Sequence, residues 1–431
     1  MMKIRQSLMA ALLVATAGVT MHGGAPGLPA AAKPEDVGLS AQRLPRIHAA
    51  VQRYLDQRQL AGAVTLVARR GKVAHFEAHG VMDLDSNVPM RKDAIFRIAS
   101  MSKPVTGVAI AMLLEEGALR LTDPVSRFIP EFKDMKVSVT RPGYVAPPVP
   151  PGQIAPLPDY YTVPADREIT IRDLLTHTSG LESGTLGNRL GARLAPRDTS
   201  KTLADQIPRL ALVPLDFQPG SQWTYSLLAG MDTLGRIVEI ASGQSYDQFL
   251  KQRVFDPLGM KDTGFVVPAD KAPRMAGLYN RTPRGIEKGD TPAWLSTHTF
   301  FSGGGGLWST AEDYAQFAQM LLNGGELNGT RLLSPRTVEL MATNHVAELY
   351  NGAGAGTRVQ GMGFGLSMEV VLDNIRANRR TSNGSFGWDG AFGTHFWVDP
   401  KEKLIGVLMV QTPGTGVTRD FENAVMQAVV D

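Results

Sequence analysis

The spacing of hydrophobic residues in the first hundred positions predicts one helix followed by a pair of strands. Leu44, Ile47 and Val51 recur at three- or four-residue intervals, which is typical of an amphipathic helix. Residues 62–80 form two strand-like runs on either side of a turn near residues 70–72. The N-terminal part of the chain is therefore expected to contribute a helix and paired strands to one domain.

The most apolar helix predicted by the pattern begins at Ser100. Residues 105–113 follow the helical template, and the opposite face of the segment is also apolar or small. A helix that is apolar nearly all round lies buried in a domain centre. We expect it to end near Gly117, and Pro104 fits only in its first turn. This places Ser100 at the helix N-terminus and Lys103 one turn further, on the same side.

The rest of the chain separates into a helical middle and a C-terminal third that is rich in strands. Helices are expected in residues 169–181, 202–215, 227–243, 245–260, 309–325 and 420–430. Ser309 and Glu312 have the spacing of a capping box at the start of one of these helices. Strand-like runs occupy residues 363–371, 393–400 and 403–411.

This distribution predicts an α/β (α+β) fold in which both ends of the chain build one domain. Residues 33–99 and 295–431 are expected to form an antiparallel sheet flanked by helices, and residues 100–294 an inserted, mostly helical domain. Residues 141–166 are rich in proline and lack periodicity, which indicates a loop at the edge of a site or a surface insertion. A cleft where the two domains meet is the expected ligand site.

Residues 1–32 are expected to be a signal peptide and a flexible leader. Lys3 and Arg5 precede an apolar run, and small residues follow at positions 15–17. The three alanines at positions 30–32 offer a second cleavage site, and a single N-terminal anchor is the alternative to secretion. Because the apolar run is short for a membrane span, a periplasmic or secreted protein without stable membrane insertion is expected.

The amino-acid composition limits the kinds of partner and of catalytic group that the protein can use. A hydrophobic content of 43% with 20% charged residues is typical of a globular protein. The net charge of +3 is too close to neutral to indicate a nucleic-acid or membrane partner. The chain contains no cysteine, so disulfides, thiol nucleophiles and thiolate metal ligands are excluded.

Several common catalytic motifs are absent. The sequence contains no G-x-S-x-G, no H-E-x-x-H and no phosphate-binding G-x-x-x-x-G-K motif. The glycine run in residues 301–310 lacks the lysine of a phosphate loop and indicates a tight turn. The eight histidines show no metal-ligand spacing and are interpreted as structural or exposed, so no metal site is predicted.

Ser100 and Lys103 are candidates for a nucleophile and its proton acceptor. A serine hydroxyl needs a neighbouring base, and a lysine one helical turn away can reach it. The free backbone N–H of Ser100 at a helix N-terminus can also hold an oxyanion. The alternative is that Ser100 is only a helix cap and Lys103 an exposed first-turn residue.

Two further stretches complete the candidate site. Tyr225 stands just before a predicted helix, where it is either a proton-transfer group or, beside Trp223, a buried aromatic anchor. Residues 388–391, with the sequence W-D-G-A, are expected to lead into a strand, and alone they indicate only a bend before an edge strand.

Together and in this order, S-M-S-K, Y-S-L and W-D-G-A resemble the motifs of the penicillin-recognising serine hydrolases. In particular the chain resembles the family VIII carboxylesterases, which are built on the class C β-lactamase fold. Stretches such as LTDPVSRFIP, FDPLGMKDTGF and GGGLWSTAEDYAQFAQMLLNGG resemble that family as well, so the similarity covers nearly the whole chain after the leader.

The resemblance implies a role for each matching position. Ser100 would be the acylated nucleophile, and Lys103 and Tyr225 would form the proton network. The backbone N–H groups of Ser100 and Ala391 would form the oxyanion hole. The substrate would be bound by residues that follow the family motifs, namely Leu227, Trp388, Asp389 and Gly390. No cofactor is implied.

Two departures from the family pattern bear on the substrate. β-Lactamases and peptidases of this group carry an asparagine where this chain has Leu227, and a lysine where it has Trp388. Neither replacement offers an amide partner or a positive charge for a carboxylate. A short-chain ester is therefore the expected small-molecule substrate. The resemblance to the esterase branch of the family also implies a side activity on cephalosporin-type β-lactams.

Three rival functions remain open at this point. The first is a β-lactamase or D-alanyl-D-alanine carboxypeptidase that uses the same serine. The second is an amide hydrolase acting on linear oligomers. The third is an inactive relative that serves as a binding protein, which the joint presence of Ser100, Lys103 and Tyr225 disfavours. The sequence does not define an oligomeric state.

Overall fold

The computed structural model describes residues 27–145, 147, 156–290, 299–350 and 360–431. Most of the expected leader, residues 1–26, lies outside the described residues. Two of its last residues contact the folded chain, because the backbone N–H of Ala31 donates to Val73 O at 2.8 Å and Ala30 forms a bridge with Val73.

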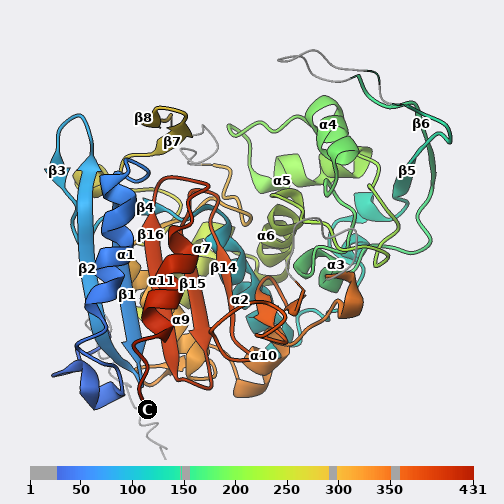
Figure 1. The fold of residues 1–431 in the computed structure, drawn as a ribbon. Helices are drawn as coiled ribbons and strands as arrows, with labels where there is room; N and C mark the ends of the chain where they lie inside the picture. The colour runs from blue at the N-terminus through green and yellow to red at the C-terminus, as the bar shows by residue number, and fades with distance from the viewer. Residues whose placement is uncertain (1–26, 146, 148–155, 291–298, 351–359) are drawn as a thin grey trace, which may run out of the picture.

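An eight-stranded antiparallel sheet, made from both ends of the chain, is the centre of the fold (Figure 1). Its spatial order is β12-β13-β14-β15-β16-β1-β2-β3. The N- and C-terminal segments meet where β1 pairs with β16, from Ala63 opposite Val410 to Arg69 opposite Leu404. The strands are β1 (Gly62–Arg69), β2 (Lys72–Asp83), β3 (Val88–Pro89), β12 (Met362–Phe364), β13 (Glu369–Val371), β14 (Phe386–Asp389), β15 (His395–Asp399) and β16 (Leu404–Val410). The predicted sheet from both termini is confirmed.

Helices cover both faces of this sheet. On one face α1 (Pro45–Asp56) and α11 (Val417–Met426) lie side by side. On the other face α9 (Ala311–Leu322) packs against β1, β15 and β16. Successive side chains of β1 point to opposite faces of the sheet and so contribute to both layers. Val67 packs under α1 and α11, whereas Leu66 belongs to the larger core on the opposite face.

The predicted central helix is α2 (Ser102–Glu115), preceded by the 3₁₀ turn η2 (Ala99–Met101). Every residue from 102 to 113 is buried, which confirms the expectation drawn from its all-round apolar pattern. Helix α2 packs against α6 (Ala229–Ser242) and α10 (Pro335–Met341). Pro104 lies in its first turn, and Gly117 follows its end with a left-handed φ of 73°.

The helical part lies beside the sheet and is drawn in green in Figure 1. Its helices are α3 (Ile171–Leu175), α4 (Thr185–Leu194), α5 (Leu203–Gln206), α7 (Tyr246–Leu250), the π-helix η6 (Lys251–Phe255) and α8 (Asp256–Leu258). The 3₁₀ helices are η1 (Pro34–Val37), η3 (Val125–Arg127), η4 (Pro130–Phe132), η5 (Ile207–Leu212), η7 (Ala272–Arg274) and η9 (Ala347–Leu349). Two-stranded ribbons pair β4 (Phe96–Arg97) with β9 (Trp308–Ser309), β5 (Lys136–Thr140) with β6 (Tyr160–Pro164), β7 (Tyr279–Thr282) with β8 (Gly285–Lys288), and β10 (Glu326–Leu327) with β11 (Thr330–Arg331).

No helix within the described residues has the length and apolar character needed to cross a bilayer.

Four local predictions differ from the structure. The loop expected over residues 141–166 ends in strand β6, because its aromatic and β-branched residues pair with β5. The run at residues 363–371 is a hairpin, β12 and β13, rather than one strand. Trp388 and Asp389 lead into strand β15 as expected, but they also end strand β14, and both strands lie inside the sheet rather than at its edge. The cap of α9 is Thr310, one residue later than expected, because its hydroxyl accepts the N–H of Asp313.

Candidate functional site

Ser100 lies in the 3₁₀ turn η2, immediately before α2. The preceding residue, Ala99, has a φ of 44°, a left-handed conformation that is costly for a residue with a side chain. The turn closes through the N–H of Met101, which donates to Ile98 O at 3.0 Å. Ser100 is only partly buried, whereas its neighbours on both sides are buried. The turn therefore presents this one hydroxyl at the surface of a rigid core.

Lys103 is completely buried, and its Nζ contacts three oxygen atoms. Its Nζ lies 3.2 Å from Ser100 Oγ and donates to the backbone oxygens of Leu227 and Gly304, each at 2.6 Å. When the amine is neutral, these two backbone bonds use both of its donors, and its lone pair faces Ser100 Oγ. The alternative of an exposed first-turn lysine is therefore wrong.

Tyr225 lies next to Lys103. Its ring centroid is 4.9 Å from Lys103 Nζ and 4.6 Å from the ring of His177. Its buried hydroxyl has no hydrogen-bond partner among the described residues. His177 supports the segment that carries Tyr225, because its Nδ1 accepts the N–H of Ser226 at 3.2 Å. Tyr225 is thus held near Ser100 and Lys103, and its hydroxyl forms no hydrogen bond with the described residues.

A buried carboxylate fixes one of the two carbonyl groups that bind Lys103. Asp232 on α6 is fully buried and accepts from Ser302 Oγ at 2.7 Å and from the N–H of Gly304 at 3.1 Å. Its second oxygen pairs with Arg197 at 2.8 Å. Sequence reasoning assigned no role to these residues, although an acid among the apolar residues of the first turn of α6 is a signal that the sequence contains.

The turn between β14 and β15 approaches the Ser100 turn through its glycine. A Cβ on Gly390 would lie 2.5 Å from Ile98 O, so only glycine allows this contact. Ala391, the next residue, is exposed. Residues 390 and 391 are therefore brought beside the chain that leads into Ser100.

Trp388 and Asp389 were expected to line the substrate site, but Trp388 is buried among aromatic rings and Asp389 is an exposed residue paired with His395. Trp388 is 4% exposed and packs 5.5 Å from the ring of Tyr225 and 5.2 Å from that of Phe364, so it supports Tyr225. The Asp389 side chain is largely exposed and lies 2.5 Å from Nδ1 of His395. Trp388 offers substrate little surface because neighbouring aromatic rings cover it.

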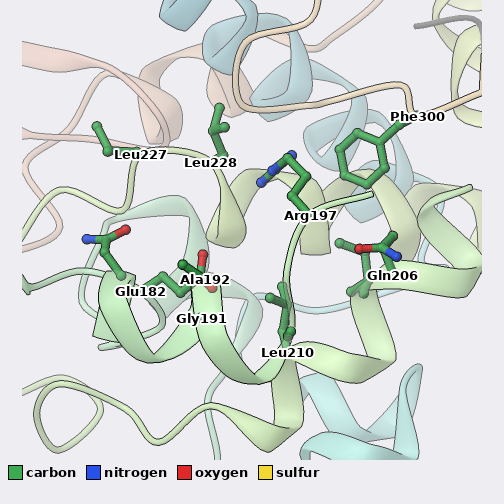
Figure 2. Close-up of a pocket in the computed structure, with 12 residues that line it drawn as sticks. Glu182, Gly191, Ala192, Arg197, Gln206, Leu210, Leu227, Leu228 and Phe300 are labelled. Carbon is green, nitrogen blue, oxygen red and sulfur yellow. The ribbon is translucent and has the colours of Figure 1, made fainter. Parts of the chain in front are cut away.

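A cavity of about 250 Å³ is connected to Lys103 through Leu227, which lines the cavity and binds Lys103 with its backbone oxygen (Figure 2). Leu227 and Leu228 stand on one side of it, and Arg197 and Phe300 on another. Leu227 is 58% exposed, so its side chain lines the cavity while its backbone oxygen binds Lys103. Burial raises the pKa of Glu182, a further lining residue, to about 7.

One group of metal-ligand type occurs in the described part of the chain, away from Ser100. It consists of His48, Glu77 and His79. The sequence interpretation took the histidines to be structural or exposed, and the fold brings His48 and His79 together around one carboxylate. The missed signal is the strand sequence H-x-E-x-H at residues 75–79, because alternate residues of a strand share one face.

Comparisons with known proteins agree with this fold. The beta-lactamase family matches residues 47–431, so the chain belongs to that family. It is 38% identical over 372 residues to Protein Rv1367c of Mycobacterium tuberculosis, covering 84% of this chain and 88% of that one. It is 32% identical over 409 residues to Esterase EstB of Burkholderia gladioli, covering 89% and 94%.

A solved structure has the same fold. EstCE1, described as a hydrolase with promiscuous acyltransferase activity, superposes with a TM-score of 0.72 at 28% identity. The match covers 89% of this chain and 99% of EstCE1. The expected resemblance to the family VIII esterases of the penicillin-recognising superfamily is confirmed by these relatives and by the family match.

Proposed function

We propose that this protein is a serine carboxylesterase that cleaves short-chain acyl esters through an acyl-enzyme on Ser100. The observation that carries the proposal is the contact of Ser100 Oγ with the buried Lys103 Nζ at 3.2 Å, beside the ring of Tyr225. Its relatives EstB and EstCE1, named as an esterase and a hydrolase, support hydrolysis of esters.

In the proposed reaction Ser100 Oγ attacks the ester carbonyl carbon. Its proton passes to the pair formed by Lys103 and Tyr225, and the same pair returns a proton to the departing alcohol. A water molecule then attacks the acyl carbon and gives a proton to the same pair. The bond from the acyl carbon to Ser100 Oγ breaks, Ser100 Oγ takes the proton from the pair, and the acid leaves. The fixed position of Lys103, held by two backbone oxygens, supports this role.

The backbone N–H groups of Ser100 and Ala391 are the proposed oxyanion donors. Backbone amides stabilise a developing negative charge without reorganising during the reaction. The close contact of Gly390 with Ile98 supports this assignment, because it holds the β14–β15 turn next to the turn of Ser100.

The cavity beside Leu227 is the proposed site for a small, neutral part of the ester. Its volume of about 250 Å³ is below the range of about 300–1,000 Å³ for drug-sized ligands. The charge of Arg197 is paired with Asp232, and its guanidinium lies 4.8 Å from the ring of Phe300. Leu227 and Phe300 leave the lining mainly apolar, which favours a short acyl or alcohol group over a carboxylate.

Arg197 is also the observation that favours the second candidate function, β-lactam hydrolysis. Its side chain keeps 27% of its surface exposed within the cavity that is connected to Lys103 through Leu227. A guanidinium in this place is able to attract the carboxylate of a cephalosporin, a task for which the family uses the lysine that Trp388 replaces. We propose this as a side activity.

We further propose that the protein is exported to the periplasm or beyond, with cleavage near residue 17. The basic start and apolar run of the leader support export. The bond from Ala31 to Val73 favours the earlier cleavage site, because a cut after residue 32 would remove it. Cell fractionation and N-terminal sequencing test both points. Cytoplasmic protein that retains Met1 would contradict export.

The central experiment compares hydrolysis of p-nitrophenyl butyrate and of nitrocefin, a chromogenic cephalosporin, by the mature protein and by Ser100→Ala. We expect strong ester cleavage, weaker nitrocefin opening, and loss of both in the variant. A preference for nitrocefin would support the β-lactamase alternative. Ester hydrolysis that persists in the Ser100→Ala variant would contradict the proposed nucleophile.

A further inference from the structure

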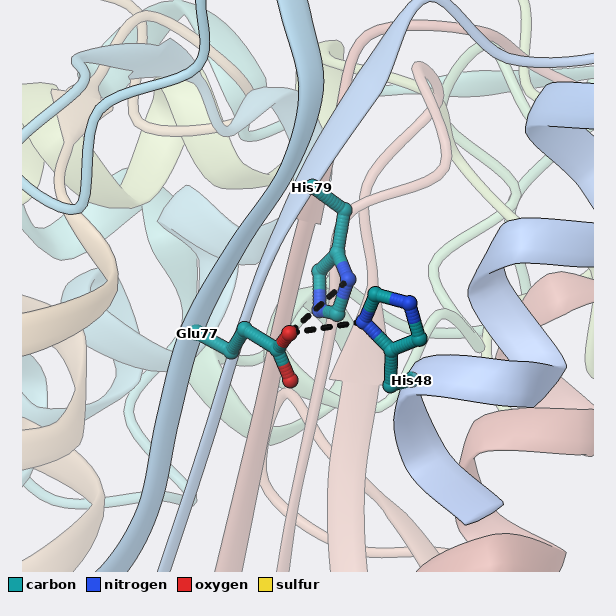
Figure 3. Close-up of side chains that lie close together, drawn as sticks. All are labelled: His48, Glu77 and His79. Carbon is teal, nitrogen blue, oxygen red and sulfur yellow. Dashed lines mark hydrogen bonds and ion pairs between the residues drawn. The ribbon is translucent and has the colours of Figure 1, made fainter. Parts of the chain in front are cut away.

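A second chemical site lies on the face of the sheet opposite to α2. Glu77 pairs with Thr65 across the β1–β2 ladder, and His79 pairs with Ala63. Ala63 belongs to the hydrophobic cluster under α1 and α11, so these residues of β2 face α1. His48 projects toward them from α1 (Figure 3).

The three side chains converge on one point. His48 Nδ1 lies 2.7 Å from Glu77 Oε1, and His79 Nδ1 lies 3.9 Å from the same oxygen. One ligand atom from each residue lies within 4.8 Å of the other two. Figure 3 shows both imidazole rings turned toward the carboxylate. A cation placed among these atoms requires only small side-chain movements.

His79 provides an independent indication of a missing ligand. Its side chain is completely buried, and its Nδ1 has no hydrogen-bond partner among the described residues. Its other nitrogen, Nε2, lies 2.9 Å from Thr65 Oγ1, which is also 2.8 Å from His75 Nε2. Because the hydroxyl has one proton, at least one of these two histidines must donate to it.

Donation from His79 Nε2 to Thr65 leaves a lone pair on Nδ1 that points at Glu77. The other tautomer would place a buried N–H at Nδ1 without an acceptor, since 3.9 Å is too long for a hydrogen bond. A hydrogen bond from the second ring nitrogen, which fixes the orientation of a histidine ligand, is typical of metal sites.

We propose that His48, Glu77 and His79 bind one divalent transition-metal ion of the zinc class. Two imidazoles and one carboxylate suit such an ion, and three protein ligands leave a fourth position for water. The side chains of His48 and Glu77 are 52% and 36% exposed, which gives the ion access from solvent. Binding displaces the proton that His48 Nδ1 shares with Glu77.

The bound ion would link α1 to β2 in place of the hydrogen bond between His48 and Glu77 that joins them without the ion. The sheet separates this site from Ser100, which lies with α2 on the other side. The site is therefore expected to change the stability of the fold rather than the chemistry at Ser100. This inference does not depend on the proposed esterase function.

The test is a calorimetric titration of the full chain, purified without a polyhistidine tag and stripped of metal, with ZnCl₂ alone. We expect one Zn²⁺ per chain and a rise in Tm when Zn²⁺ is added. His48→Ala and Glu77→Gln should each weaken binding by about 10-fold or more, and Thr65→Val by about 10- to 100-fold. His345→Gln is the matched control, because it removes a histidine outside the cluster and should bind like the wild type.

Circular dichroism in EDTA verifies that each variant is folded before it is titrated. Absence of saturable Zn²⁺ binding to the wild type would overturn the proposal. Binding that His48→Ala and Glu77→Gln leave unchanged would also overturn it, since the ion would then occupy another place.

Discussion

Lys103 is positioned in part by the backbone of Gly304, and Gly304 is held in place by Asp232. The oxygen of Gly304 accepts from Lys103 Nζ, and the N–H of the same residue donates to Asp232. Asp232 in turn pairs with Arg197, at the wall of the cavity. A single buried carboxylate thereby connects the lysine to the proposed substrate cavity, and we regard Asp232 as a positioning residue.

Asp232→Asn should weaken both the fold and the reaction. The asparagine amide would turn donors toward Arg197 or toward Gly304 and leave Arg197 without its counter-charge. We expect the free energy of unfolding to fall by about 3 kcal/mol, with a decrease in kcat on p-nitrophenyl butyrate. Urea unfolding and steady-state kinetics measure the two effects.

The matched control is Asp420→Asn, which removes a carboxylate that pairs with Arg53 at the surface. Both partners are more than a third exposed, so the loss should stay below about 1 kcal/mol, with kcat unchanged. Equal losses in the two variants would show that the buried network has no special role.

The raised pKa of Glu182 predicts a specific dependence of the stability of the fold on pH. Burial raises the pKa of this carboxyl from 4.5 to about 7, so the folded state holds a proton that the unfolded state has already lost in this range. Its contribution to stability is therefore full below about pH 4.5 and is lost as the pH rises through about 7.

Relative to Glu182→Gln, the wild type should lose about 2 kcal/mol of stability between pH 5 and pH 8. Urea unfolding of both proteins at the two pH values gives this difference. Glu287→Gln, at an exposed position, serves as the control and should show no such trend. A pH-independent gap between wild type and Glu182→Gln would contradict the raised pKa.

At the scale of the elements, the start of α9 was predicted correctly as a capped helix end, but the capping residue was misplaced by one position. Both Ser309 and Thr310 are suitable caps, and the sequence favoured Ser309 because Glu312 completes a capping box. In the structure the Ser309 hydroxyl lies 2.7 Å from that of Thr263, a contact distant in sequence. Thr310 is therefore the residue that caps the helix.

Thr310→Ala should lower the free energy of unfolding by about 1 kcal/mol, because the N–H of Asp313 loses its acceptor. Thr310→Ser keeps the hydroxyl and should lose less. Thermal or urea unfolding of the two variants measures the difference. If serine and alanine were equally destabilising, the lost methyl group rather than the cap would be responsible.

The elements that the sequence predicted well are those with a strong local pattern. Helix α2 is apolar on all sides, and β1 and β2 flank a glycine turn, so local spacing was sufficient. Strand β6 was missed because its partner, β5, lies on the far side of a proline-rich stretch. Strand β14 was not predicted for a similar reason, since its pairing with β13 and β15 is decided by tertiary contacts.

At the scale of the whole molecule, the candidate site combines segments that are far apart in the chain. Ser100 and Lys103 come from the start of α2, Tyr225 and Leu227 from the helical part, and Gly390 from the C-terminal sheet. The side chains were identifiable from motif order. The backbone oxygens that bind Lys103 were not, because any residue provides a carbonyl group and only the folded chain determines which ones converge.

The measurement that tests the account most directly is mass spectrometry of the protein after rapid acid quenching during turnover of p-nitrophenyl butyrate. The account predicts a butyryl group on the peptide that contains Ser100, and no such adduct on the Ser100→Ala variant. A stable adduct on a different residue, or full hydrolysis by the variant, would contradict the assignment of Ser100 as the nucleophile.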